Sequence, residues 1–380
     1  MDFEFTKDQK MLQEEVRKFA DAHIAPDAAE IDQSRDFPWK NIKKTAEMGL
    51  LGIIVPEKYG GSGFDYISLA IAIEELSRCC ASTGVIVAVN NSLVTYPIVA
   101  FGTEEQKQKY LPALCSGEKL GAFGLTEPNA GSDVAGMETT ARLEGDHYII
   151  NGTKRFITNA GEAGTFIVFA STDRNLKHKG ISTFIVERDT PGFSLGKHED
   201  LMGVRATANC ELIFEDAKIP KENLLGKEGQ GFMIAMNVLD VSRIDIGAQA
   251  VGIAQSALDE SVKYAKERKA FGQPIGNFEM IQNMLAEMAT QICAARFLVY
   301  YAGHCKNKGM PRFSRESAMS KYYGATIAVD VARKGVQIHG GYGYTKDYPI
   351  ERIYRDAKIL ELYEGTSEIQ KIVIARDLLK

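Results

Sequence analysis

Near the C-terminus, an acidic residue stands at a break between two segments of helical periodicity. Residues 361–368 have the sequence ELYEGTSE, with a helical pattern over 352–359 before them and another from residue 369 onward. Gly365 can adopt backbone angles that other residues resist, so we expect the break at Glu364–Gly365. A carboxylate held between two helices has the placement that a general base needs. The alternative, which this stretch alone favours, is that Glu364 is a solvated residue on a surface helix.

Three other stretches combine glycine with residues that can bind a ligand. In Phe123–Asp133 (FGLTEPNAGSD), backbone N–H groups and hydroxyls could surround a flat heteroaromatic ring, although the pattern is neither a Walker loop nor GxGxxG. In Arg268–Gly272 (RKAFG), the guanidinium suits a pyrophosphate. In Gln337–Tyr344 (QIHGGYGY), glycines let the backbone approach a ligand closely. The alternatives are an interdomain loop, a solvated helix end and a flexible link after a helix, respectively.

Asp240 and Arg243 are three residues apart in a predicted helix, so they lie on one face and can form an ion pair. The alternative is a surface ion pair, which contributes little to stability.

Composition excludes several classes of function. A chain of 380 residues with 45% hydrophobic and 25% charged residues is expected to form two or three globular domains. The net charge of −5 and the dispersed basic residues disfavour a nucleic-acid partner. Six cysteines without C-x-x-C spacing predict reduced thiols in a cytoplasmic protein, and six histidines without ligand spacing predict no metal site. Residues 1–6 lack the features of a signal or transit peptide, and no apolar run approaches membrane-spanning length, so we expect no membrane insertion.

Secondary-structure patterns change twice along the chain. The first ~115 residues are predicted to be helical, with Thr6 as the first N-cap and a nearly uncharged segment over 83–100. The polar break in that segment, Asn90–Ser92, could face a buried partner or a ligand. Short β-branched segments follow, with Asn151–Gly152 predicted as a hairpin turn. Long helical patterns from Gly231 onward predict a bundle. The predicted domains are a helical domain over 1–118, a β domain over 119–228 and a helical bundle over 229–380.

Taken together, in this order and spacing, the motifs carry a family resemblance. They are Phe123–Ser132, Phe156–Thr158, Met202–Arg205, Arg268–Gly272, Gln337–Gly341 and Tyr363–Glu368. The chain resembles the acyl-CoA dehydrogenase family over essentially its whole length, and most closely its short-chain (butyryl-CoA) branch. The resemblance implies a multidomain α+β fold with a helical N-terminal domain, a central β-barrel-like domain and a C-terminal four-helix bundle. It also implies an FAD cofactor, a homotetramer and a role in the β-oxidation of fatty acids.

The resemblance assigns roles to individual residues. The implied cofactor contacts are Phe123, Leu125, Thr126, Gly131, Ser132, Phe156, Ile157, Thr158, Arg268, Phe271, Glu279, Gln337, Gly340, Gly341, Thr366 and Glu368. Of these, the residues from 123 to 158 would surround the isoalloxazine ring. Arg268, Phe271 and 337–341 would reach the pyrophosphate and adenosine half of a neighbouring subunit's FAD. The implied substrate contacts are Ser132, Asp240, Arg243, Tyr363 and Gly365.

Glu364 matches the catalytic base of the family. The implied reaction is α,β-dehydrogenation of an acyl-CoA thioester to the trans-2-enoyl-CoA, in which Glu364 removes the α-proton and flavin N5 accepts the β-hydride. Hydrogen bonds from the Glu364 N–H and a flavin ribityl hydroxyl would stabilise the enolate-like thioester oxygen. The electrons would pass to an electron-transfer flavoprotein. Some branches of the family carry the base immediately before the arginine that corresponds to Arg243. That position is Ser242 here, which cannot act as the base.

The chain departs from the family pattern at three positions. Phe156 replaces a tryptophan beside the flavin, Thr207 replaces a serine, and Glu279 replaces a glutamine, which puts FAD affinity in doubt. The position of the acyl-pocket arginine in glutaryl-type members corresponds to Gly84, so an uncharged short acyl chain is favoured. The pocket could be shaped by Asn90, Asn91, Val94 and Tyr96. The alternatives are an enoyl-CoA reductase, an enzyme for a branched, cyclic or dicarboxylic acyl-CoA, and a non-catalytic acyl-CoA-binding protein.

Overall fold

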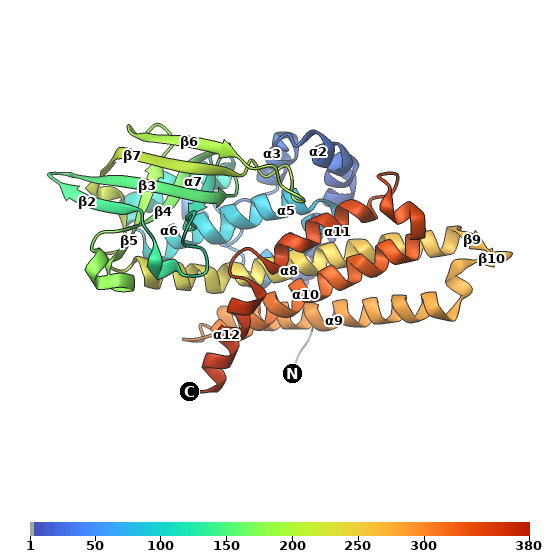
Figure 1. Cartoon of the computed structure of the whole chain (residues 1–380). Helices are drawn as coiled ribbons and strands as arrows, with labels where there is room; N and C mark the ends of the chain where they lie inside the picture. Colours follow the sequence, from blue (N-terminus) through green and yellow to red (C-terminus); the bar gives the residue numbers. More distant parts are fainter. Residues whose placement is uncertain (1–3) are drawn as a thin grey trace.

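The computed structural model describes residues 4–380. Residues 1–3, which are part of the segment predicted to lack a signal or transit peptide, lie outside the described part. Helices form the N-terminal part, a β-sheet the middle and long helices the C-terminal part (Figure 1). This arrangement confirms the predicted fold class. The N-terminal helices are α1 (Lys7–Phe19), α2 (Ala28–Ser34), α3 (Trp39–Glu47), α4 (Tyr66–Cys79), α5 (Ala81–Ala88), α6 (Tyr96–Phe101) and α7 (Glu104–Ser116), with the π-helical turns η1 (Ala20–Ile24) and η4 (Val89–Thr95).

The helix starts follow local side-chain chemistry. Thr6 accepts a hydrogen bond from the backbone N–H of Gln9, whose side chain accepts from the N–H of Thr6 in return. The same reciprocal capping box joins Thr103 and Gln106 at the start of α7. Each box satisfies two of the N–H groups that a helix start leaves without an intrahelical partner. The predicted N-cap at Thr6 is therefore confirmed.

The segment Ala81–Phe101 corrects one expectation. By length and composition it could cross a membrane, with a mean hydropathy of 1.6, yet 83% of its apolar 18-residue window is buried inside the molecule. The expectation that no apolar run approaches membrane-spanning length was wrong, because a helix enclosed by protein on all sides is as apolar as one enclosed by lipid. The asparagines of the polar break in this segment bind backbone carbonyl groups. Asn90 Nδ2 donates to the Leu51 carbonyl, and Asn91 Nδ2 donates to the Leu50 carbonyl, each at 2.9 Å.

The middle part is one eight-stranded sheet in the order β6-β7-β3-β2-β4-β5-β8, with β1 pairing in parallel with β4. Its buried face forms a hydrophobic cluster of its own around Phe166, Phe184 and Phe214. The strands are β1 (Leu120–Gly124), β2 (Thr140–Glu144), β3 (His147–Ile157), β4 (Ala163–Ser171), β5 (Ile181–Glu187), β6 (Phe193–His198), β7 (Cys210–Pro220) and β8 (Leu224–Leu225).

The predicted hairpin turn at Asn151–Gly152 was wrong. These residues lie inside β3, and the turn between β2 and β3 is at Gly145–Asp146, where Gly145 has a φ of 64°. The pairing of β3 with β7 shifts register between Ile150 and Gly152, where Gly152 has a φ of 144°. A Cβ at Gly152 would lie 2.5 Å from the Thr139 hydroxyl oxygen. The Asn-Gly pair therefore marks a bulge and a close approach, which have the same glycine signal as a turn.

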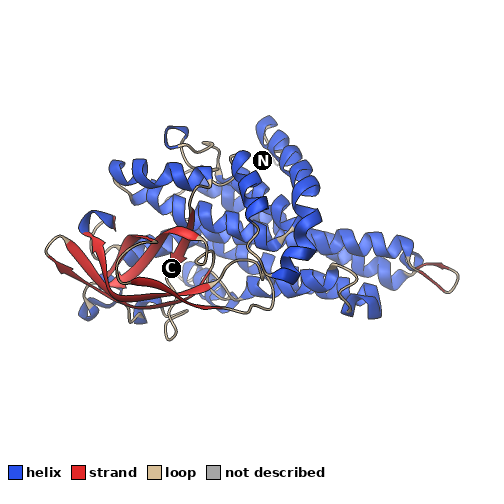
Figure 2. Cartoon of the chain, turned by 90° about the horizontal axis from the view of Figure 1, so that it is seen from above, coloured by secondary structure: helices blue, strands red, loops and turns tan. Residues whose placement is uncertain are grey.

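The C-terminal helices are α8 (Gly231–Glu267), α9 (Glu279–Asn307), α10 (Ser314–His339), α11 (Ile350–Lys358) and α12 (Ser367–Leu378). α8 packs against α4, α9 and α10, and every residue from Val241 to Ala254 is buried. A two-stranded hairpin, β9 (Lys269–Ala270) and β10 (Gln273–Pro274), joins α8 to α9. Figure 2 shows this hairpin at the end of the bundle opposite the sheet.

Candidate functional site

The backbone turns sharply at Glu364 and Gly365, where φ is 52° and 89°. α11 is followed by the short helix η10 (Ile359–Glu361), and Thr366 caps α12 by accepting from the N–H of Ile369 at 3.4 Å. The predicted break between two helices is therefore confirmed. A left-handed conformation costs a residue other than glycine about 1–2 kcal/mol, so surrounding contacts must hold Glu364 in place.

Two side chains hold the backbone of this turn. Lys321 Nζ, from α10, donates to the Gly365 carbonyl at 2.7 Å, and Gln370 Nε2, from α12, donates to the same carbonyl at 2.8 Å. Gln370 also donates to the Glu364 carbonyl at 3.2 Å. Lys321 and Gln370 are both fully buried. The carbonyls of the turn are thus satisfied, while the Glu364 N–H has no hydrogen-bond acceptor within residues 4–380.

Glu364 is half-buried, and part of its carboxyl group points into the protein. Its Oε2 atom is buried and has no hydrogen-bond partner in the described part of the chain. Burial raises the pKa of this carboxyl to about 7, although the neighbouring Ser242 hydroxyl and the charges of Lys321 and Arg243 act in the opposite direction. The interpretation of Glu364 as a solvated surface residue was wrong. The group is poised to exchange a proton near neutral pH.

The pair of Asp240 and Arg243 is also inside the protein. Arg243 Nη1 donates to Asp240 Oδ1 at 2.8 Å, and only 4% of Arg243 is exposed. Asp240 accepts a further hydrogen bond from the Ser314 hydroxyl. The alternative of a surface ion pair is therefore excluded. Arg243 Nη2 lies 3.8 Å from where a Cβ on Gly365 would be, so the guanidinium borders the turn that carries Glu364.

One face of α8 carries three polar side chains opposite this turn. Ser242, Asp245 and Gln249 are three and four residues apart, which places them on one side of the helix. Ser242 neighbours the Glu364 carboxyl, and Gln249 accepts a hydrogen bond from the Tyr363 hydroxyl. Asp245 lies between them, and burial raises the pKa of its carboxyl well above the ordinary value. We call Ser242, Asp245 and Gln249 the α8 polar stripe.

Sequence reasoning missed Lys321, Gln370, Asp245 and Gln249. The stripe leaves one signal, because polar residues interrupt an otherwise apolar run over 241–254 at helical spacing. Lys321 and Gln370 leave none, since their contacts depend on how α10 and α12 pack.

A buried ion pair positions the predicted flavin loop. Lys154 of β3 is fully buried, and its Nζ lies 2.7 Å from Glu127 Oε1. Burial lowers the pKa of Lys154 to about 8, against the opposing effect of Glu127. Lys154 also donates to the Leu125 carbonyl at 3.3 Å, and the Thr126 carbonyl accepts from the Arg155 N–H at 2.8 Å. The loop after β1 is therefore joined to the end of β3, as its predicted role requires.

Most of the residues that were predicted to surround the isoalloxazine ring lie close to this junction between the loop after β1 and the end of β3. Phe123 packs edge-on against Phe169, with ring centroids 5.0 Å apart. Gly131 and Ser132 are exposed on the loop, while Ile157 is buried and Thr158 is half-buried. Phe156 has a φ of 59° and remains 56% exposed. An exposed aromatic ring held in a strained backbone conformation is available to a ligand.

Four further predicted cofactor residues lie at the hairpin end of the bundle: Arg268, Phe271, Gly340 and Gly341. Phe271, at the tip of the β9–β10 hairpin, is 94% exposed, and the Arg268 guanidinium stands 5.6 Å over the Tyr342 ring. His339 stacks on Tyr264 with centroids 4.2 Å apart. An open pocket of about 480 Å³ is lined by Tyr264, Arg268, Ile275, Ile338, His339, Gly340, Gly341, Tyr342 and Thr345. Tyr264 is a further residue that sequence reasoning did not identify.

Five of the predicted cofactor residues from 268 to 368 do not line this pocket: Phe271, Glu279, Gln337, Thr366 and Glu368. Glu279 is the exposed first residue of α9, and Gln337 is exposed on α10. Thr366 and Glu368 lie beside Glu364, at the start of α12. The pocket residues belong to the end of α8, the segment after the hairpin and the end of α10. These elements lie at the end of the molecule opposite the sheet, and Phe156 belongs to β3 of that sheet (Figures 1 and 2). Within one chain, the predicted cofactor residues therefore form two separate groups.

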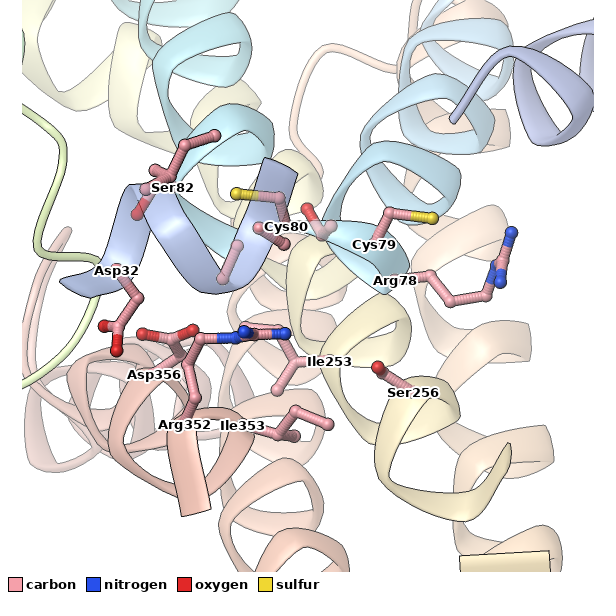
Figure 3. Close-up of a pocket in the computed structure, with 14 residues that line it drawn as sticks. Asp32, Arg78, Cys79, Cys80, Ser82, Ile253, Ser256, Arg352, Ile353 and Asp356 are labelled. Carbon is pink, nitrogen blue, oxygen red and sulfur yellow. The ribbon is translucent and has the colours of Figure 1, made fainter. Parts of the chain in front are cut away.

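A second cavity lies where α2, α4, α5, α8 and α11 meet (Figure 3). It holds about 20 Å³, which is room for one water-sized molecule. The side chains of Cys79 and Cys80 point apart in Figure 3, so they do not form a dithiol site. This cavity is too small for an organic substrate.

Three family models match the chain in sequence. They are the N-terminal domain of acyl-CoA dehydrogenase over residues 6–118, its middle domain over 122–217 and its C-terminal domain over 229–379. Together they cover most of the chain, in the order of its helical, sheet and helical parts.

Curated relatives match over their whole length. A protein described as short-chain specific acyl-CoA dehydrogenase, from Clostridium acetobutylicum, is 52% identical over 375 residues, covering 99% of each chain. An acryloyl-CoA reductase (NADH) from Anaerotignum propionicum is 50% identical, covering 100% of this chain and 96% of the relative.

Solved structures agree with this. Butyryl-CoA dehydrogenase from Megasphaera elsdenii is 45% identical with a TM-score of 0.98, covering 100% of both chains. A chain in a structure described as the electron transferring flavoprotein of Acidaminococcus fermentans is 51% identical with a TM-score of 0.98, also covering 100% of both. An acyl-CoA dehydrogenase complexed with FAD, from Bacillus anthracis, is 38% identical with a TM-score of 0.92, covering 99% of this chain and 67% of that one.

Proposed function

The chain belongs to the acyl-CoA dehydrogenase family, and on that premise we propose that it catalyses FAD-dependent α,β-dehydrogenation of a short acyl-CoA thioester to the trans-2-enoyl-CoA. The relatives described as short-chain or butyryl-CoA dehydrogenases support the reaction and the short acyl chain. The observation that carries the proposal is the buried, unpartnered Oε2 atom of Glu364, beside a backbone N–H that has no acceptor in residues 4–380.

Glu364 is the base that removes the α-proton of the thioester. A thioester α-proton is weakly acidic, so its removal needs a basic carboxylate and stabilisation of the charge that develops on the thioester oxygen. The pKa of about 7, which results from burial, makes Glu364 a stronger base than an exposed carboxylate and leaves it partly ionised at neutral pH. The free N–H of the same residue can donate to the thioester oxygen.

Lys321, Gln370 and Arg243 position this base. Lys321 and Gln370 hold the carbonyls of residues 364 and 365, so the strained turn cannot relax when the substrate enters. The buried charges of Lys321 and Arg243 favour the ionised form of Glu364 and limit the rise of its pKa. Without them, the carboxyl of Glu364 would be protonated over a wider range of pH.

Two features of the structure fit FAD, which the B. anthracis relative binds. Near Phe156, the exposed ring and the loop over 125–132 offer an aromatic surface and backbone donors for a flat ring system. In the open pocket at the hairpin end, a Cβ on Gly340 or Gly341 would have no atom within 4 Å, so the backbone can contact a pyrophosphate directly. Arg268 has no ion pair with any residue of 4–380 and is available to a phosphate. When bound, FAD accepts the hydride from the β-carbon.

Because the two groups lie at opposite ends of one chain, we infer that each FAD contacts the Phe156 region of one subunit and the Arg268 pocket of another. This is the argument for a homotetramer, in which Arg268, Phe271, Gln337, Gly340 and Gly341 serve a neighbour. Glu279 is assigned to the same group, although it does not line the pocket. The structure described for an electron transferring flavoprotein supports such a protein as the electron acceptor.

The proposal extends to domains, location and acyl group. The domains are 1–118, 119–228 and 229–380, because strands replace helices at β1 and helices return at α8. Six unpaired thiols favour the reducing cytoplasm. A Cβ on Gly84 would lie 2.0 Å from the Ser77 hydroxyl oxygen, so no charged side chain fits at the position that glutaryl-type members use. Asn90 and Asn91 are engaged by backbone carbonyls and do not contribute free polar groups.

A second candidate is the reverse reaction, reduction of a short enoyl-CoA, which the relative described as an acryloyl-CoA reductase favours. The same Glu364 would then return a proton to the α-carbon. The two candidates differ in the partner that exchanges electrons with the flavin.

The test is an anaerobic visible spectrum of the purified holoenzyme before and after addition of butyryl-CoA. We expect the flavin band to bleach, crotonyl-CoA to form, and an electron-transfer flavoprotein to restore the band. A flavin that stays oxidised with every short acyl-CoA would exclude the dehydrogenase. Reduction of crotonyl-CoA with NADH, without turnover in the other direction, would establish the second candidate.

A further inference from the structure

Asp245, in the middle of the α8 polar stripe, has no role in the mechanism above. It is 1% exposed, and its Oδ2 atom is buried with no hydrogen-bond partner among residues 4–380. The residues on either side of it along the stripe are engaged by the catalytic turn, Ser242 by Glu364 and Gln249 by Tyr363. Asp245 therefore faces the side of α8 on which the substrate must bind if Glu364 is the base.

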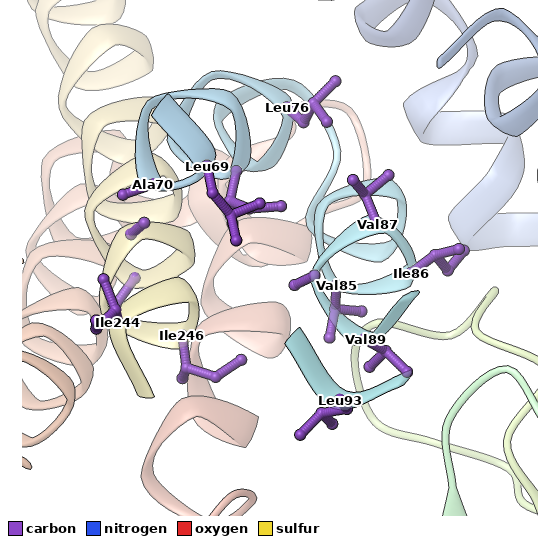
Figure 4. Packing of buried hydrophobic residues seen from close by; sticks show 14 of the residues in the cluster. Leu69, Ala70, Leu76, Val85, Ile86, Val87, Val89, Leu93, Ile244 and Ile246 are labelled. Carbon is purple, nitrogen blue, oxygen red and sulfur yellow. The ribbon is translucent and has the colours of Figure 1, made fainter. Parts of the chain in front are cut away.

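Asp245 belongs to α8, which contacts η4, and both elements are rich in buried apolar side chains. Ser92 of η4, which interacts with the Asp245 carboxyl, is followed by Leu93. Figure 4 shows Ile246 of α8 directed toward the segment that carries Val85 and Leu93, and all three belong to the main hydrophobic cluster. A polar group among such side chains costs free energy unless it is hydrogen-bonded. Its presence beside a binding site points to a ligand that supplies the missing partner.

The hydrogen-bond donors and acceptors determine which partner is missing. The Ser92 hydroxyl donates its only proton to the Ala88 carbonyl at 2.9 Å, so toward Asp245 it can act only as an acceptor. If Asp245 is neutral and its proton lies between one carboxyl oxygen and Ser92, Oδ2 is left as an acceptor. Oδ2 therefore requires a donor.

We propose that Asp245 selects an acyl group with a neutral hydrogen-bond donor, in particular a hydroxyl, at its distal end, so that the preferred substrate is a short hydroxyacyl thioester. This inference rests on the proposed function and deepens it. An unsubstituted chain would leave Oδ2 buried without a partner, and a site built for a hydroxyl discriminates against the analogue that lacks it.

The experiment compares 4-hydroxybutyryl-CoA with pentanoyl-CoA, which differ only in a terminal hydroxyl or methyl group. We expect the holoenzyme to have a kcat/KM about ten-fold or more higher for the hydroxy compound. Asp245→Leu, which has a similar shape and no acceptor, should reverse the preference. Asp245→Asn should keep it, because the amide nitrogen can donate to Ser92 while its oxygen accepts from the ligand. Asp259→Leu, at an exposed position of α8, is the matched control.

Each outcome is decisive. Equal turnover of both thioesters by the wild-type enzyme, or a preference for pentanoyl-CoA, overturns the inference while the proposed function stands. Loss of the preference in Asp245→Asn as well as in Asp245→Leu also overturns it, because recognition would then depend on a carboxylate charge. If no thioester is dehydrogenated by FAD-loaded enzyme, the proposed function fails and the inference fails with it. The ratio of kcat/KM values of the wild-type enzyme for the two thioesters tests the inference even if Asp245→Leu does not fold.

Discussion

The two ends of the long bundle differ in how deeply their charged side chains are buried. Beside Glu364, charged groups are buried and face one another: Lys321 is fully buried, Arg243 is 4% exposed, and the carboxyl has a raised pKa. At the hairpin end, Arg268 is exposed over an open pocket and Phe271 is 94% exposed. Every group that the turn needs for its shape comes from the same chain. At the hairpin end, by contrast, the Arg268 guanidinium has no ion-pair partner among residues 4–380.

This difference corresponds to two tasks. A base for proton transfer needs a low-dielectric environment, where neighbouring charges act strongly on its pKa. A phosphate-binding site needs accessible donors that a second molecule can reach, and it tolerates solvent. Under the proposed function, the buried end is the site of chemistry and the open end is a surface that serves a neighbouring subunit. The predictions below test this distinction.

The largest effect is expected at the turn. Glu364→Gln keeps the shape of the side chain but removes the base, so we expect kcat with a short acyl-CoA to fall by at least about 10³-fold. FAD content should be unchanged, because the substitution keeps the shape of the side chain and leaves the neighbouring Thr366 and Glu368 in place. Glu361→Gln, three residues away and paired with Lys358 at 2.6 Å, is the control and should retain activity. Near-normal dehydrogenation by Glu364→Gln would show that another group is the base.

The next effect concerns a charge that acts through Glu364. Lys321→Met removes both the hydrogen bond to the Gly365 carbonyl and a positive charge that lowers the pKa of Glu364. In the wild-type enzyme, kcat/KM should rise with pH through about 7, because the base must be ionised. In the variant, the rise should shift to higher pH, so activity at pH 7 falls by about 10-fold or more and partly recovers at pH 9. Lys334→Met, on the same helix, should leave the profile in place.

A profile for Lys321→Met with an unchanged midpoint, but lower throughout, would mean that the lysine only positions the backbone. A midpoint at lower pH would contradict the electrostatic argument.

The hairpin end should affect binding instead. Arg268→Ala should weaken FAD binding by about 10-fold or more, as expected for a charge-assisted contact, and leave the pH profile unchanged. FAD retention after dilution measures this effect, with Lys266→Ala as the exposed control on the same helix.

Mixed oligomers test whether the contact crosses subunits. At limiting FAD, co-expressed Glu364→Gln and Arg268→Ala chains should regain activity, because one site then combines an intact Glu364 with the intact Arg268 of a neighbour. If Arg268 served its own chain, every site in the mixture would lack one of the two groups, and no activity would return.

Sequence patterns predicted the fold because its features are local. The capping boxes at Thr6 and Thr103 and the period of the long helices each depend on residues close together in the chain. The error at Asn151–Gly152 has the same origin. A bulge and a turn share their glycine signal, and only the partner strand decides between them.

The candidate site was predictable only in part. The turn at Glu364 and the motif around Arg268 were visible in the sequence, but the separation of these regions in space was not. Lys321 reaches Gly365 across 44 residues and Lys154 reaches Glu127 across 27, and nothing local distinguishes these lysines from solvated ones. For Asp240 and Arg243, the sequence left a surface pair and a buried pair open, because burial is a property of the packed bundle. Long-range packing, more than local propensity, determines the electrostatics of the site.

The smallest effect that separates the two ends is a dependence of stability on pH. The pKa of Asp245 is raised by burial in the folded state, so above its unfolded value the folded protein binds more protons than the unfolded chain, and stability falls as pH rises. Asp245→Asn removes this term. The Tm of the ligand-free holoenzyme should therefore exceed that of the wild type by a margin that grows between pH 5 and pH 8, to about 2–4 °C. Asp259→Asn, on the exposed face of α8, and Arg268→Ala, at the open end, are the controls for this measurement. A constant margin for Asp245→Asn would mean that the carboxyl is ionised in the folded protein, and the contrast between a buried and a solvated end would then rest on Glu364 alone.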